Sequence, residues 1–136
     1  MKQSMRTKSI TERLESIKIA KGRTILCKLR EIAYTKPLKS DIGEIPGLYA
    51  RFQAVSDPAC KDNVKIFVLL IFFVYDPVSL VSKRMLRGKV RKELGEVLGI
   101  SGSAVTRHFA DAKSLFNHHK GFKEEAERIF SALHTG

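Results

Sequence analysis

The sequence predicts an all-α protein, a small helical domain of five to seven helices. Apolar residues recur at helical intervals through most of the chain, and helix-start and helix-stop signals separate these segments. The 136 residues suffice for one compact domain with a hydrophobic core. We expect a basic N-terminal helical segment or arm over residues 1–39 and a helical domain over residues 40–136.

Two helical segments are expected before residue 40. The first, Ser9 to Ala20, starts with a serine that is followed three residues later by Glu12, which is the spacing of a capping box. Gly22 interrupts the helical pattern, and Thr24 to Tyr34 continues it. Two short helices or one bent helix fit this pattern equally well.

The middle of the chain predicts a loop followed by a buried helix. Lys36 to Pro58 is rich in Pro and Gly, so we expect a loop with at most one short helix near Leu48 to Val55. Asp57-Pro58 is typical of a helix start and would begin a helix that runs to about Tyr75. Its apolar run, Ile66 to Tyr75, also suits a buried strand, which is the alternative. As a helix the run rises about 15 Å, half the thickness of a bilayer core, so we expect no membrane span.

The next segments continue the helical pattern. Asp76-Pro77 repeats the helix-start signal and predicts a helix to about Leu86, which Gly88 would close. Two further helices are expected, one over Lys89 to Leu98 and one from Gly102 to about His118.

A last amphipathic helix is expected after Gly121, over Phe122 to Leu133. Its apolar stripe is interpreted as core or as a subunit contact. A homo-oligomer would use either this 122–133 helix or the 66–75 apolar segment.

The segment Leu94 to Phe109, LGEVLGISGSAVTRHF, carries the most specific pattern in the chain. Gly95 has no side chain, so a second helix can cross closely over the first at that point. Gly99 falls where the first helix must end, at a position that often needs φ above zero. Ser101 offers an oxygen to the free N–H groups of the next helix. Apolar side chains at suitable separations give the two helices a shared core: Leu94, Leu98, Ile100, Val105 and Phe109.

This segment resembles the helix-turn-helix superfamily of DNA-binding proteins over about residues 89–116. The resemblance implies that the second helix enters the major groove of double-stranded DNA. One departure is Gly102, where that helix more often begins with a polar or basic side chain. The matching or conservatively substituted positions are Leu94, Gly95, Leu98, Gly99, Ile100, Ser101, Val105, Thr106, Arg107, His108 and Phe109.

Applied position by position, the resemblance makes Ser103, Thr106 and Arg107 the base-reading candidates. A guanidinium fork can meet both acceptors of guanine, so Arg107 is the strongest of the three. A phosphate contact or a salt bridge with Asp111 is the alternative for Arg107. The candidates for phosphate contacts are the basic cluster that enters the motif and two residues within it: Lys83, Arg84, Arg87, Lys89, Arg91, Lys92, Ser101 and Lys113.

The charge distribution supports a polyanionic partner. The formal net charge is +11. Residues 1–39 hold eleven Lys or Arg against three Glu, residues 40–76 hold three against five acids, and residues 77–136 hold eleven against six. Basic charge therefore flanks an acidic middle, and nucleic acid would engage the two ends. A solvated surface that keeps the protein soluble is the alternative.

Enzymatic and metal-binding functions are not expected. The chain has no Walker-type loop, no HExxH and no paired cysteines, so we expect no catalytic residues, no metal site and no cofactor. Cys27 and Cys60 lie too far apart in the sequence to suggest a disulfide framework, which favours an intracellular, cytoplasmic protein, nucleoid-associated if it is bacterial.

The sequence therefore predicts a non-enzymatic, double-stranded-DNA-binding protein, foremost a transcriptional regulator. One alternative is a DNA-packaging or recombination accessory factor of a phage or mobile element, similar to a terminase small subunit. The other is a protein-interaction or structural module that uses the helix-turn-helix only for packing.

Overall fold

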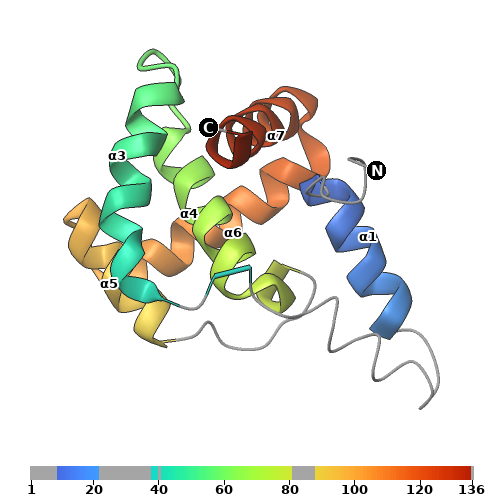
Figure 1. Cartoon of the computed structure of the whole chain (residues 1–136), viewed down its shortest axis with the longest axis horizontal. Helices are drawn as coiled ribbons and strands as arrows, with labels where there is room; N and C mark the ends of the chain where they lie inside the picture. The colour runs from blue at the N-terminus through green and yellow to red at the C-terminus, as the bar shows by residue number, and fades with distance from the viewer. Residues whose placement is uncertain (1–8, 22–37, 40, 81–87, 136) are drawn as a thin grey trace.

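The computed structural model describes residues 9–21, 38–39, 41–80 and 88–135. This part of the chain holds six α-helices and no strand, which confirms the all-α prediction (Figure 1). The expected helix over Thr24 to Tyr34 and the end of the helix expected to reach Leu86 lie outside the described residues. The α-helices are α1 (Ile10–Lys21), α3 (Ile45–Val55), α4 (Asn63–Tyr75), α5 (Gly88–Leu98), α6 (Gly102–His118) and α7 (Lys120–Thr135), and two short 3-10 helices are η3 (Ile42–Glu44) and η4 (Pro77–Leu80).

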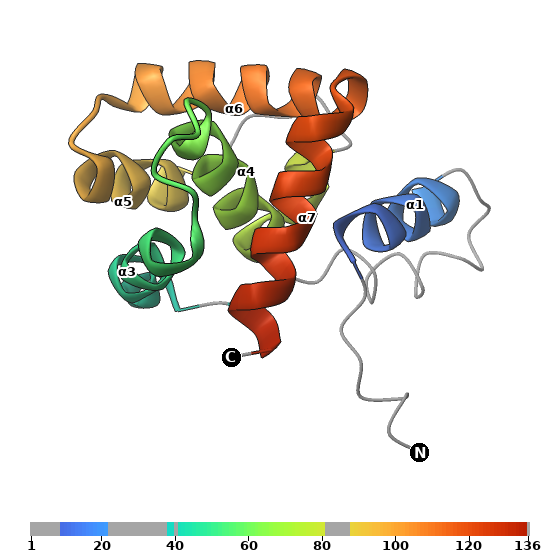
Figure 2. The ribbon, with the colours of Figure 1, turned by 90° about the horizontal axis from the view of Figure 1, so that it is seen from above.

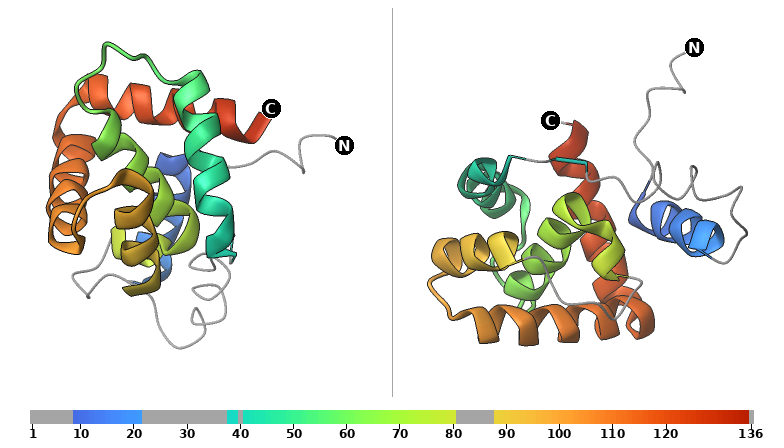
Figure 3. Two further views of the ribbon diagram at one scale, coloured as in Figure 1. Left: turned by 90° about the vertical axis from the view of Figure 1, so that its left-hand side faces the viewer. Right: turned by 90° about the horizontal axis from the view of Figure 1, so that it is seen from below.

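Helix α4 forms the centre of the core. Each of the ten side chains from Ile66 to Tyr75 is at most 5% exposed, so this part of the helix is covered on all sides. It lies between α6 and α3 in Figure 3, and it contacts α5 and α7 as well. The helix prediction for the apolar run is thus confirmed over the strand alternative. No described helix is both long and apolar enough to cross a membrane.

Aromatic pairs join α4 to three of its neighbouring helices. Ring centroids lie 5.1 Å apart for Phe67 and Phe52 of α3, and 4.6 Å apart for Phe72 and Phe109 of α6. On α7, the ring of Phe130 meets Phe73 edge to face at 5.1 Å. These separations are favourable for aromatic pairs, so one helix fixes the positions of three others.

The end of α4 is held by a buried tyrosine. Tyr75 donates its hydroxyl hydrogen to the backbone oxygen of Asp41 at 2.8 Å. Burial, and next the negative charges of Glu44 and Asp41, raise the pKa of Tyr75 to about 12. The hydroxyl therefore stays protonated at physiological pH and keeps its hydrogen bond.

Helix α1 docks onto α7. The predicted capping box is confirmed, since the Glu12 amide donates to Ser9 Oγ at 3.1 Å and the Ser9 amide to Glu12 Oε1 at 3.0 Å. A second acceptor, which the sequence did not indicate, is Glu127 of α7. Its carboxylate accepts from the Ile10 amide at 3.0 Å, the Thr11 amide at 3.0 Å and the Thr11 hydroxyl at 2.7 Å. The start of the predicted N-terminal arm is thus tied to the helical domain.

Two helix starts in the middle of the chain differ from the predictions. Helix α3 begins at Ile45, three residues before the expected Leu48, because Pro46 fits the first helical turn, where its missing N–H costs nothing. Asp57-Pro58 does not start α4. Instead, the Asp57 side chain accepts a hydrogen bond from the Ala59 amide, and the Asp57 carbonyl oxygen accepts one from the Cys60 amide. These two bonds close a local turn, and α4 begins at Asn63.

The boundaries after α4 also need correction. Asp76-Pro77 begins the 3-10 helix η4 rather than an α-helical turn, and Gly88 is the first residue of α5, while residues 81–87 lie outside the described residues. The break before α7 falls at His119, not at Gly121. His119 leaves the helical conformation, and its Nδ1 accepts a hydrogen bond from the Phe122 amide at 3.1 Å, so the imidazole caps α7.

The apolar faces expected to serve a homo-oligomer lie inside this chain. Four residues of the α7 stripe, Phe122, Ala126, Ile129 and Phe130, are at most 4% exposed. The 66–75 segment is equally buried. The α7 stripe is therefore core, as one of its two interpretations held, while the homo-oligomer itself stays a prediction.

The connection between α5 and α6 has the backbone that its glycines predict. Gly99 has φ of 70°, in the region that favours glycine. Ser101 caps α6, because its Oγ accepts from the Ala104 amide at 3.1 Å. A Cβ at position 95 would lie 2.7 Å from the backbone oxygen of Ile100. Gly95 thus allows the connection between α5 and α6 to pass close to α5, whereas the prediction had the second helix cross at this point. The Gly95 carbonyl oxygen accepts a hydrogen bond from the Ile100 amide at 2.9 Å.

We expect Gly95→Ala to lower the free energy of unfolding by about 1–2 kcal/mol, because the new methyl group overlaps a backbone oxygen that cannot rotate away. Gly47→Ala is the matched control, since it also lies in a helix but the new Cβ would meet no atom within 4 Å beyond its chain neighbours and the backbone of its own helix. Helix propensity should then stabilise that variant by up to about 1 kcal/mol. Urea unfolding measures both changes, and an equal gain at the two positions would contradict the close approach at Gly95.

We expect Glu127→Ala to lower the free energy of unfolding by about 1–3 kcal/mol, because two amides and one hydroxyl at the start of α1 lose a charged acceptor. Amide hydrogen exchange at Ile10 and Thr11 should accelerate in the same variant. Glu124→Ala is the control, since its exposed pair with Lys120 at 4.0 Å should contribute less than about 0.5 kcal/mol. Unchanged exchange at Ile10 and Thr11 would show that Glu127 does not hold α1.

Candidate nucleic-acid interface

The polar side of α6 lies at the surface of the molecule. Figure 2 shows α6 along one edge, with α4 and α5 on its inner side. Val105 and Phe109 are at most 3% exposed, and Phe109 packs on Phe72 of α4. Because the apolar positions face α4, the intervening polar positions must face outward.

The predicted base-reading candidates share this outward side. Ser103, Thr106 and Arg107 are exposed, as is the capping residue Ser101. Arg107 forms no ion pair with Asp111, one turn further along α6, so the salt-bridge alternative for Arg107 is not realised in the structure. The cap and first two turns of α6 therefore present to solvent two serines and a guanidinium that pairs with no described carboxylate.

Thr106 is engaged within the protein. Its hydroxyl donates to the Gly102 carbonyl at 3.1 Å and accepts from Arg91 Nη1 of α5 at 3.4 Å. The Arg91 side chain also lies over Gly102, where its Nε would be 3.5 Å from an added Cβ. The absence of a side chain at Gly102 thus leaves room for an arginine from the other helix. Fifteen residues separate Arg91 from Thr106, and no sequence pattern indicated this contact.

The other predicted phosphate candidates fall into three groups. Lys89 and Lys92 are exposed on α5, and Lys92 lines a surface hollow together with Arg91, Glu96 and Gly102. Lys113 is directed inward, where its Nζ donates to the Ser79 carbonyl at 3.3 Å and lies 5.0 Å from the centre of the Phe109 ring. The Lys113 ammonium is therefore engaged by groups of the protein itself. The remaining candidates, Lys83, Arg84 and Arg87, lie outside the described residues.

The histidine and cysteine side chains of the described residues have few partners among themselves that could share a ligand. No group of three or more His, Cys, Asp or Glu there is placed to hold a metal ion. His119 has a structural role as the cap of α7. Cys60 is a half-buried free thiol, and Cys27 lies outside the described residues.

Comparisons of the chain with models of protein families, with curated proteins and with solved structures find no match. The interpretation of the α5–α6 surface therefore depends on the residues and geometry of this chain.

Proposed function

We propose that the protein binds double-stranded DNA, with α5 and α6 as a helix-turn-helix, and that it acts as a transcriptional regulator. The observation that carries this proposal is the division of α6 into two sides. Its apolar side packs on α4, while Ser103 and Arg107 face solvent at the start of the helix. A rigid helix with a free polar N-terminal turn is what a major groove accepts.

Each exposed group has a role in this proposal. Arg107 donates two hydrogen bonds to the O6 and N7 acceptors of a guanine, and Ser103 contacts a neighbouring base edge. Lys89 and Lys92 contact phosphates, together with Ser101 at the start of α6. These phosphate contacts give affinity that falls with salt, whereas the base contacts give sequence preference. Lys113 has no part in binding, because it is engaged with Ser79.

The distribution of apolar surface supports DNA binding over a protein-interaction module. The exposed large hydrophobic residues among those described are Leu38 and Val64, each 38% exposed. A stable protein interface normally has a desolvated apolar centre. The described surface offers no apolar stripe of that kind, whereas it does offer basic and hydroxyl groups on α5 and α6.

The proposal predicts that Arg107→Ala abolishes preference for a selected DNA site. Loss of a bidentate base contact of about 1–3 kcal/mol corresponds to about a 5- to 150-fold loss in affinity for that site. Binding to random duplex should weaken much less. Lys120→Ala removes a cation from the start of α7, beyond the C-terminal end of α6 and thirteen residues after Arg107, and should leave site preference intact.

The measurement is duplex binding over a series of salt concentrations, with the selected site and with random duplex. Parent protein that shows no salt-sensitive binding to either duplex would refute the proposal. Parent binding with equal loss in the Arg107 and Lys120 variants would refute only the role of Arg107.

A second prediction concerns the link between α5 and α6. Arg91→Ala should weaken binding to all duplexes and lower the slope of log affinity against log salt by about one, as a lost phosphate contact does. Thr106→Val should weaken binding about two- to fivefold because it releases the Arg91 guanidinium. Thr106→Ser keeps the hydroxyl and should bind as the parent does.

The double variant separates a positioning role for Thr106 from direct contact with DNA. If Thr106 acts through Arg91, Thr106→Val should have no further effect in the Arg91→Ala background. Fully additive losses would instead indicate that the Thr106 hydroxyl touches DNA itself.

A further inference from the structure

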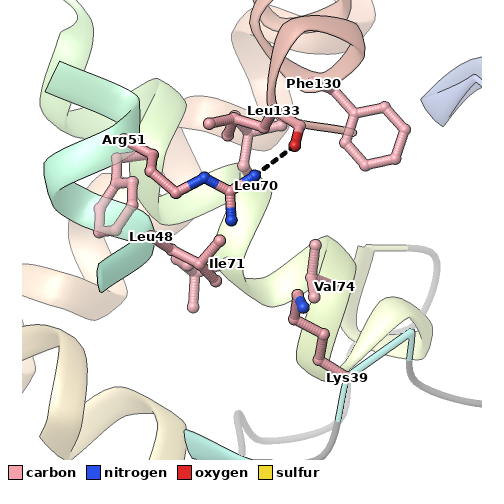
Figure 4. A pocket seen from close by; sticks show the side chains of 9 residues that line it. Lys39, Leu48, Arg51, Leu70, Ile71, Val74, Phe130 and Leu133 are labelled. Carbon is pink, nitrogen blue, oxygen red and sulfur yellow. Dashed lines mark hydrogen bonds between the residues drawn. The ribbon is translucent and has the colours of Figure 1, made fainter. Parts of the chain in front are cut away.

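An apolar cavity of about 90 Å³ opens between α3, α4 and α7, on elements that DNA binding does not use. Most of its lining residues come from these three helices and belong to the hydrophobic core. The side chains in Figure 4 converge on this space from all three. The apolar lining includes Leu48, Leu70, Ile71, Val74, Phe130 and Leu133.

Two cations lie at the rim of this apolar cavity. Figure 4 shows Arg51 of α3 and Lys39 reaching the same opening from different sides. Lys39 is paired with Glu44 at 3.0 Å, but among the described residues Arg51 has no carboxylate partner. The rim thus carries one positive charge that the described side chains do not neutralise.

Arg51 also has a structural role, which leaves donors unused. Its Nη2 donates to the Leu133 carbonyl at 2.6 Å. That carbonyl belongs to the last turn of α7, where the helix supplies no partner. A guanidinium has five N–H donors, so the remaining ones can serve a ligand while the bond to α7 is kept.

We propose that this cavity binds a small monocarboxylate with a short aliphatic tail. The tail enters the apolar space, and the carboxylate accepts hydrogen bonds from Arg51 at the rim, with Lys39 as the second cation. A dry apolar cavity of about 150 Å³ is large enough for benzene, so 90 Å³ suits a tail of about three or four carbons. One unpaired cation matches one negative charge, which favours a monoanion over a phosphate ester.

A series of linear carboxylates tests both parts of the site in the parent protein. Acetate, propanoate, butanoate and pentanoate are titrated while the methyl resonances of Leu48, Leu70 and Val74 are followed. We expect affinity to rise about fourfold for each added methylene, from about 0.8 kcal/mol per group, until the cavity is full. Saturable shifts should be confined to the cavity walls. Equal affinity along the series, or shifts elsewhere, would overturn the proposal.

The charge requirement has its own control. Pentanamide has the tail of pentanoate without the negative charge. Its affinity should be lower than that of pentanoate by a factor of at least about ten. Arg51→Gln removes the unpaired cation and leaves Lys39 paired with Glu44, so most of the preference for pentanoate over pentanamide should be lost. Arg128→Gln, on α7 outside the cavity lining, should preserve the difference. Parent protein that does not distinguish pentanoate from pentanamide would overturn the carboxylate assignment, whether or not the Arg51 variant folds.

Discussion

The burial of α4 on every side from Ile66 to Tyr75 is the constraint on which the rest of the structure depends. A helix that is apolar on every side must be surrounded, and here four helices surround it. Phe67, Phe72 and Phe73 each pair with a ring on a different neighbouring helix. Because protein interiors are close-packed, these contacts fix where α3, α6 and α7 can lie.

This constraint also determines which side of α6 is free. Phe109 and Val105 are committed to α4, so Ser103 and Arg107 must project away from it. Gly95 and Gly99 then bring α5 close enough for Arg91 to reach the first turn of α6. The proposed DNA-binding surface is thus assembled by the core before any ligand arrives, and a site supported in this way loses little entropy on binding.

Much of the fold follows from local patterns in the sequence. The capping pair Ser9 and Glu12, the positive φ of Gly99, the cap at Ser101 and the bounds of α6 were all predicted and are confirmed. Asp57-Pro58 was wrong as the start of α4, whereas Asp76-Pro77 begins the 3-10 helix η4, and the rest of the helix predicted there lies outside the described residues. Asp57 and Asp76 each accept backbone bonds from residues two or three positions later, so a local turn competes with the helix at both places.

The remaining features depend on contacts between distant residues and leave no periodic signal. Glu127 accepts from the start of α1 across 116 or more positions, and Arg51 reaches the Leu133 carbonyl across 82. The inward orientation of Lys113 toward Ser79 likewise requires the packing of α6 beside η4. A spacing rule places a side chain on a face of a helix, but the partner that occupies it comes from the tertiary fold.

The central claim is that the core presents the first turns of α6 to DNA. The most direct test is to map amide chemical-shift changes on isotopically labelled protein titrated with a short random duplex at low salt. We predict the largest changes between Ser101 and Arg107, with smaller ones at Lys89 and Lys92, all reversed by added salt. Largest changes on α3 or α7, with α6 unaffected, would contradict the account.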